Sequence, residues 1–214
     1  MKKTLALLAA CLMFAAPASA DILAEWTFET SPPTTAGPHA ADSGSGNALG
    51  FHAGSSTYSN PTGNGSTESF SSNTWAVGDY YQFSTSSVGY SGIEFSWDQA
   101  GSNTGPADFE LSWSTDGTNF TSLLNHVVPS GSFSSVSVNA LFQNGPVAAP
   151  SALDNQATIY FRLTNSSTLS INGGTVASGG TGRVDNVVIT GVVPEPATIA
   201  LLSLGGLVVI RRRK

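Results

Sequence analysis

Short runs in which apolar and polar residues alternate recur along the middle of this 214-residue chain, and they restrict its fold more than any other feature. A period of two places every second side chain on the same face of an extended strand, so each run predicts a strand with one buried face. The clearest runs are GIEFSWDQ (92–99), DFELSWSTDG (108–117) and TIYFRLT (158–164). Their apolar positions, which we expect in the core, are Ile93, Phe95 and Trp97; Phe109, Leu111 and Trp113; and Ile159, Phe161 and Leu163.

Four further runs bring the number of expected strands to seven: residues 23–29, 79–86, 134–141 and 183–191. Turn sequences such as Asp116-Gly117 separate the runs, and no window between residues 21 and 190 has the 3.6-residue period of an amphipathic helix. Residues 31–73 predict a long loop with one short strand near Leu49–Phe51. Strands without the spacing of βαβ units indicate an all-β fold, an antiparallel β-sandwich.

The distribution of charge excludes one class of partner. Between Asp21 and Val193 the only cations are Arg162 and Arg183, against thirteen acidic residues, so this part of the chain has a net charge near −11. A nucleic-acid binder needs clustered Lys and Arg to replace the counterions of phosphates. We therefore expect no nucleic-acid partner, and we interpret the acidity as that of an exported surface. Calcium binding by carboxylates is the alternative, although no EF-hand loop is present.

The N-terminal segment MKKTLALLAACLMFAAPASA has the three parts of a secretory signal peptide. Two lysines precede an apolar run, and Ala18-Ser19-Ala20 forms a small-residue cleavage site, so we expect cleavage between Ala20 and Asp21. The stretch Leu8–Cys11 also fits a lipoprotein box, but the apolar run continues beyond it.

Cys11 is the only cysteine in the sequence and lies inside the expected signal peptide. The mature protein would then have no disulfide, no cysteine-bound zinc and no thiol nucleophile. Its stability must therefore come from a hydrophobic core, for which roughly 170 residues are enough.

The C-terminus combines Pro194-Glu195-Pro196 with an apolar stretch of 14 residues (197–210) and a basic end. The four cations of that end are Arg211, Arg212, Arg213 and Lys214. The apolar stretch is short for a membrane span of about 20 residues, and the cations favour a cytoplasmic C-terminus. The prolines keep the preceding segment extended, a form that a processing enzyme can grip. An ordinary tail anchor is the alternative.

This order of parts, Pro194-Glu195-Pro196, an apolar run with Gly205-Gly206 and a basic end, resembles the PEP-CTERM sorting signal. The resemblance implies an exported protein held transiently in the inner membrane by a transmembrane helix. It also implies a partner, an exosortase-type membrane transpeptidase that removes the tail and leaves the protein in the cell envelope or outside the cell. The expected division is a signal peptide (1–20), a β-sandwich body (21–191) and a sorting signal (192–214).

The body resembles the jelly-roll sandwiches of secreted carbohydrate-binding modules and adhesive domains. The resemblance lies in an opening EWTFE strand, a central LSWSTDGTNF hairpin and a closing RVDNVVITG strand. Many such modules hold a structural calcium between acidic residues of the first and last strands, which makes Glu29 and Asp185 the pair to examine. Alternatively, Asp185 pairs with Arg183 or caps a turn. We expect no other cofactor or metal.

The sequence contains no recognisable catalytic motif, neither H-E-x-x-H nor G-x-S-x-G. We expect His39, His52 and His126 in exposed loops. Trp97 and Trp113 have the core-facing parity of their strands, so Trp75 is the tryptophan to test for contact with sugar. Four carboxylates on the expected strands predict a solvated face, with a glycosidase pair as the alternative. They are Glu94, Asp98, Asp108 and Glu110.

Together these features predict an exported, non-enzymatic binding or structural module linked to exopolysaccharide. A secreted polysaccharide hydrolase and a calcium-dependent adhesin are the alternatives.

Overall fold

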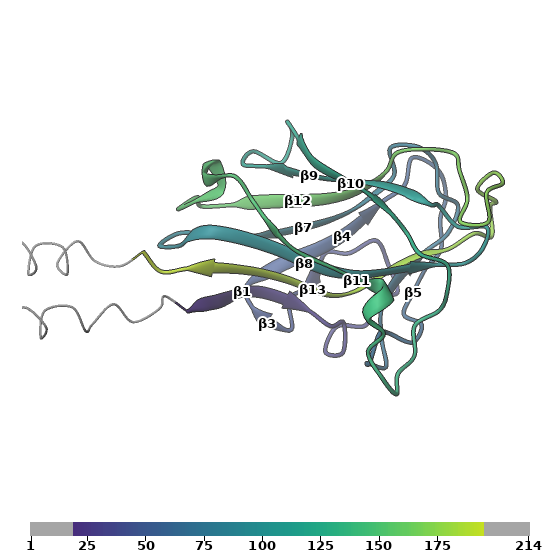
Figure 1. Ribbon diagram of the computed structural model, residues 1–214, viewed down its shortest axis with the longest axis horizontal. Coiled ribbons are helices and arrows are strands. Elements are labelled where there is room, and N and C mark those ends of the chain that lie inside the picture. Colours follow the sequence, from purple (N-terminus) through teal and green to yellow (C-terminus); the bar gives the residue numbers. More distant parts are fainter. Residues whose placement is uncertain (1–18, 195–214) are drawn as a thin grey trace, which may run out of the picture.

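Two β-sheets packed face to face make up residues 19–194, the part of the chain that the computed structural model describes (Figure 1). The strands are β1 (Ala20–Trp26), β2 (His39–Ala40), β3 (Ser43–Gly44), β4 (Gly46–Phe51), β5 (Tyr58–Ser59), β6 (Phe70–Ser72), β7 (Tyr80–Thr85), β8 (Ser91–Gly101), β9 (Asp108–Ser114), β10 (Thr121–Val127), β11 (Gln143–Ala148), β12 (Ile159–Asn165) and β13 (Gly182–Val192). Two short 3₁₀ helices, η1 (Ala140–Phe142) and η2 (Ser151–Leu153), complete the elements.

The two sheets are antiparallel throughout, and the chain crosses repeatedly between them. The six-stranded sheet has the order β10-β9-β12-β7-β4-β2, and the seven-stranded sheet contains the path β11-β8-β13-β1-β3, with β6 beside β13 and β5 beside β6. Strands β7 to β13 change sheet at every connection except the β9–β10 hairpin. This arrangement confirms the predicted all-β, antiparallel sandwich of jelly-roll type.

The core lies between the sheets and is built from the residues that alternation singles out. Phe95 of β8 faces the opposite sheet, where its ring lies 4.7 Å from that of Phe161 on β12 and 5.9 Å from that of Phe83 on β7. All three side chains are fully buried, and each contributes roughly 1.5–3 kcal/mol to the free energy of unfolding. Of the nine predicted core positions only Trp113 remains partly exposed, at the edge of this cluster.

Two of the expected elements are wrong. Residues 134–141 were expected to form a strand, but they form bends that lead into η1, and Val136 is 92% exposed. The side chains that anchor this segment are instead Phe133 and Phe142. Their rings meet edge to face at 5.3 Å. The segment 31–73 contains five short strands, β2 to β6, and a single one was expected. These strands are two to six residues long, too short for alternation to identify them.

The first and last strands, β1 and β13, lie side by side, and the start of β1 is at the same end of the sandwich as the end of β13 (Figure 1). Ala20 pairs with Val192 and Asp21 with Gly191. Every core residue of the described chain lies between Leu23 and Ile189, so the body completes its core without either end. Within residues 19–194 no helix has the length and apolarity of a membrane span, and the predicted span at 197–210 falls outside this range.

Candidate functional site

The outer face of the six-stranded sheet carries the side chains that alternate with the core residues. On β7 and β12 the outward residues include Tyr80, Gln82 and Arg162. The strand register places Arg162 beside Gln82, and Tyr80 beside Phe51 of β4. Residues distant in sequence therefore form one continuous surface, which we call the outer face.

Aromatic rings and one guanidinium form a stack across the outer face. The ring of Phe51 lies 5.0 Å from that of Tyr80 at an interplanar angle of 18°, and Phe51 is 45% exposed. The guanidinium carbon of Arg162 lies 3.9 Å from the ring centre of Tyr80 and 3.7 Å from that of Phe120. Such cation–π contacts each contribute about 0.5–1 kcal/mol at exposed sites. The stack Phe51–Tyr80–Arg162–Phe120 is thus held before any ligand arrives.

Hydrogen bonds and a tight turn fix the stack in place. The Nε of Arg162 donates to Oε1 of Gln82 at 2.7 Å, and partial burial lowers the pKa of Arg162 while leaving it charged. Phe120 follows the turn around Gly117, where φ is +70° and an added Cβ would lie 3.1 Å from the ring of Tyr160. Asp116 accepts hydrogen bonds from the side chain and backbone of Asn119 and from Thr118, and these bonds lower the pKa of Asp116. The predicted Asp-Gly turn therefore positions Phe120.

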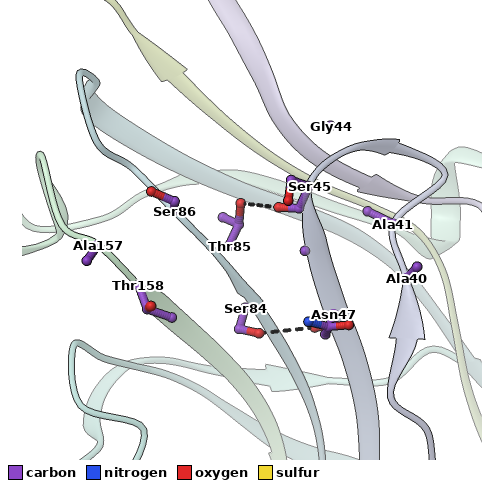
Figure 2. A pocket seen from close by; sticks show the side chains of 11 residues that line it. Ala40, Ala41, Gly44, Ser45, Asn47, Ser84, Thr85, Ser86, Ala157 and Thr158 are labelled. Atoms are coloured by element: carbon purple, nitrogen blue, oxygen red, sulfur yellow. Dashed lines mark hydrogen bonds between the residues drawn. The ribbon is translucent and has the colours of Figure 1, made fainter.

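A groove of about 450 Å³ lies beside the end of β7, between residues of β2, β4 and β7 in the six-stranded sheet and Gly44 of β3 in the other sheet (Figure 2). Small residues line it: Ala40, Ala41, Gly44, Ser45, Gly46, Asn47, Ser84, Thr85, Ser86, Ala157 and Thr158. Three of its hydroxyls are bonded to backbone carbonyls: Thr85 to Ser45 at 2.6 Å, and Ser84 to Asn47 and Ser86 to Gln156 at 3.4 Å each. From this groove the face extends along β7 to Tyr80, about 17 Å at 3.4 Å per residue.

The tryptophans lie in or against the core. Trp75, predicted to contact sugar, is only 6% exposed, so that prediction is wrong. Its Nε1 donates to the carbonyl of Ser72 at 3.0 Å, and its ring meets those of Tyr81 and Phe109 edge to face. Tyr160 of β12 shares the outward parity of Arg162 and is partly buried, and the aromatic residues of the stack itself are Phe51, Tyr80 and Phe120. Of these three, only Tyr80 could have been predicted from the sequence to face outward, because it alternates with Tyr81 and Phe83 along β7.

The histidines are also more buried than predicted. His52 lies between Asp79 and Ser72, with Nδ1 2.9 Å from Asp79 Oδ2 and Nε2 2.9 Å from Ser72 Oγ. This order of groups resembles a hydrolase triad, but Ser72 is buried and its hydroxyl is also bonded to Tyr81 at 2.8 Å. A nucleophile must reach its substrate, so we interpret the string as structural.

The other two histidines do not extend this network. His39 is buried, with its Nε2 3.0 Å from the carbonyl of Thr35. His126 stands edge-on to Trp97, and burial lowers the pKa of His126 to about 4.

The four strand carboxylates do not converge on a catalytic pair. Glu94 and Asp98 belong to β8 in one sheet, whereas Asp108 and Glu110 belong to β9 in the other. Glu110 lies on the outer face, and Asp108 accepts a hydrogen bond from Ser167. Asp98 is buried, so the prediction of a solvated face is wrong for this residue.

Glu29 and Asp185, the predicted calcium pair, hold the same loop from two sides. Glu29 accepts hydrogen bonds from the backbone of Thr67 and Glu68, and Asp185 accepts them from Asn64 and Ser66. No ion pair joins Asp185 to Arg183 in the described part of the chain. Residues 19–194 contain no group of three or more His, Cys, Asp or Glu side chains arranged to hold a metal. Calcium binding at this pair therefore stays an alternative hypothesis that the melting temperature can test.

Comparison with protein families identifies the C-terminal segment. Residues 192–214 match the model of the PEP-CTERM protein-sorting motif. The chain therefore joins an all-β sandwich to a PEP-CTERM motif, which confirms the resemblance drawn from the sequence. The motif indicates export and exosortase-mediated processing at the membrane.

Solved structures with similar folds share little sequence with this chain, and no curated protein matches it. The N-terminal CBM22-1–CBM22-2 tandem domain of Paenibacillus barcinonensis Xyn10C is 12% identical, with a TM-score of 0.48 over 84% of this chain and 51% of that one. A cleaved adhesin domain of Lys-gingipain from Porphyromonas gingivalis W83 is 14% identical, with a TM-score of 0.46 over 80% and 97%. TmCBM61, solved with beta-1,4-galactotriose, is 12% identical, with a TM-score of 0.42 over 76% and 92%. At these values the function of this chain must be argued from its own residues.

Proposed function

We propose that this chain is an exported, non-enzymatic polysaccharide-binding protein that its PEP-CTERM motif sorts to the envelope or matrix of an exopolysaccharide-producing cell. The observation that carries the proposal is the stack Phe51–Tyr80–Arg162–Phe120 on the outer face. In a body whose tryptophans lie in or against the core, this face presents aromatic rings beside hydrogen-bonding groups.

The chemistry of the outer face suits a sugar chain. Pyranose rings have apolar C–H faces that pack on aromatic rings, and their hydroxyls need donors and acceptors at the edge. Gln82, Asn47 and Ser84 supply such groups along the same face. Because the rings stand on paired strands and contact each other, little side-chain entropy is lost when a ligand binds.

The geometry of the two ends is compatible with this role. Strands β1 and β13, which lead to the signal peptide and the sorting motif, both belong to the seven-stranded sheet. Neither the signal peptide nor the sorting motif therefore starts from the outer face. A sugar chain can lie on that face while the protein is tethered to the membrane.

The test is affinity electrophoresis of residues 21–192 in gels containing the exopolysaccharide of the host. We expect retardation of the wild type and at least a tenfold weaker affinity for Tyr80→Ala, because the central ring of the stack is lost. Leu141→Ala, which truncates an exposed side chain on η1 away from the face, is the control and should bind as the wild type does. Equal retardation of the wild type, Tyr80→Ala and Leu141→Ala would contradict the proposed binding face. Release of reducing ends from the polysaccharide would contradict the non-enzymatic role.

A further inference from the structure

Arg162 is the single arginine of the outer face in a strongly acidic body. Between residues 21 and 193 the sequence offers only Arg162 and Arg183 as cations, against thirteen carboxylates. Arg183 lies on β13 in the opposite sheet, and its Nε is buried without a hydrogen-bond partner. Arg162 is therefore the one cation that an anionic ligand could bind on the outer face.

The guanidinium of Arg162 has no carboxylate partner. Within residues 19–194 the only acid–base pair at ion-pair distance is His52 with Asp79. Glu110, the carboxylate of β9 on this face, lies opposite Thr164 and so diagonally from Arg162, yet the two do not pair. With so many acidic residues available, a charge left unpaired on this surface calls for an explanation.

The donors of Arg162 are only partly used. A guanidinium has five N–H donors, of which Nε serves Gln82 at 2.7 Å and one on Nη2 reaches the carbonyl of Gly117 at a long 3.5 Å. The remaining donors have no partner among the described residues. They keep the planar geometry that matches a carboxylate with two parallel hydrogen bonds.

The stack prepares this group for binding. Tyr80 and Phe120 contact the guanidinium at 3.9 and 3.7 Å, so its plane is fixed and part of its hydration is already removed. A fixed, partly desolvated cation attracts an anion more strongly than a mobile one in open water, because less entropy is lost and the local dielectric is lower.

The geometry points to a subsite in which Arg162 binds the carboxylate of a uronic acid residue while the neighbouring sugar ring packs on the exposed ring of Phe51. Tyr80 holds both partners in place, because Phe51 and Arg162 cover its two faces. This inference rests on the proposed polysaccharide-binding function and names its ligand class. The body's net charge near −11 repels densely charged polymers within a Debye length of about 8–10 Å. The ligand is therefore a largely neutral polysaccharide with occasional acidic sugars.

Three polymers test the subsite: a glucuronoxylan, the same glucuronoxylan after chemical reduction of its carboxyl groups to alcohols, and polygalacturonate. We expect residues 21–192 to bind the native glucuronoxylan at least tenfold more tightly than its reduced form, and polygalacturonate weakly. Arg162→Gln should abolish the difference between the native and reduced forms, and Arg162→Lys should retain only part of it, because an ammonium cannot form two parallel hydrogen bonds.

The outcomes separate the subsite from the broader function. If the wild type binds both forms of the xylan equally, the carboxylate subsite is wrong while polysaccharide binding stands. If Arg162→Gln weakens binding to both forms equally and lowers the melting temperature, Arg162 only supports the aromatic rings, and the subsite is again wrong. If the wild type binds neither these polymers nor the host exopolysaccharide, the proposed function fails as well.

Discussion

Asp98 of β8 and Asp185 of β13 are paired directly across adjacent strands, and both side chains are buried. Asn64 bridges them, because its backbone N–H donates to Asp185 and its side-chain amide donates to Asp98. Oδ1 of Asp185 is buried without a partner. Burial raises the pKa of Asp185 to about 7 and also raises that of Asp98. Two carboxylates in one buried site cannot both ionise cheaply.

The contribution of Asp185 to stability falls as the pH rises from about 4 to about 7, whereas the lowered pKa of His126 acts in the opposite direction between about pH 4 and 6.5. The folded-state pKa of Asp185 lies above its unfolded value of 3.8, so the unfolded state releases its proton first and gains from each increase in pH up to about 7. His126 contributes equally in the wild type and in Asp185→Asn, so the comparison of the two isolates Asp185. We expect the urea midpoint of residues 21–192 to change less favourably from pH 5 to pH 8 in the wild type than in Asp185→Asn. The same pH dependence in both proteins would contradict the assignment.

For calcium we expect no effect on the melting temperature. The carboxylate of Glu29 is engaged by Thr67 and Glu68, and no group of three or more metal-binding side chains lies within residues 19–194. Thermal unfolding is measured in excess calcium and in excess chelator. An increase with calcium that Glu29→Gln or Asp185→Asn abolishes would instead show an ion that binds the folded state, and would favour the adhesin alternative.

The string Asp79–His52–Ser72 should stabilise the fold and have no catalytic role. Asp79 also accepts hydrogen bonds from the backbone of Ala53 and Ala76, so Asp79→Ala leaves several buried donors unpaired. We expect a loss of about 2–4 kcal/mol in the free energy of unfolding, measured with urea, while Asp21→Asn at the exposed start of β1 changes it little. An unfolding midpoint for Asp79→Ala equal to that of the wild type would show that the string is dispensable.

The C-terminal motif predicts removal of the tail in the native host. We expect intact-mass analysis to find a protein without residues 211–214 when the exosortase is present, and a chain that keeps them in a strain lacking that enzyme. The folded body ends at Val192, so Val193 and Pro194 separate it from Glu195. Retention of Arg211 to Lys214 in both strains would indicate a plain tail anchor.

The sequence was sufficient to predict the sandwich because one-sided burial of a strand is a local property. Ile93, Phe95 and Phe161 alternate with polar neighbours, and each is buried. The outer face could not be predicted in the same way, because Phe51, Tyr80 and Arg162 become neighbours only through the register of β4, β7 and β12.

Side chains whose burial depends on packing partners distant in sequence were the other source of error. Trp75 precedes β7 and packs inward, although it was singled out for contact with sugar because Trp97 and Trp113 have core-facing parity. The alternation of Val136 with serines has no neighbouring strand to bury it, and the segment therefore stays exposed.

The central claim is that polysaccharide binds on the outer face of the six-stranded sheet. The most direct measurement is a map of amide chemical-shift changes in ¹⁵N-labelled residues 21–192 during titration with oligosaccharides released from the host exopolysaccharide. We predict that the largest changes fall on Phe51, Tyr80 and Arg162 and their neighbours on β4, β7 and β12. Changes confined to the seven-stranded sheet or to the loop around Val136, or no changes at saturating oligosaccharide, would contradict it.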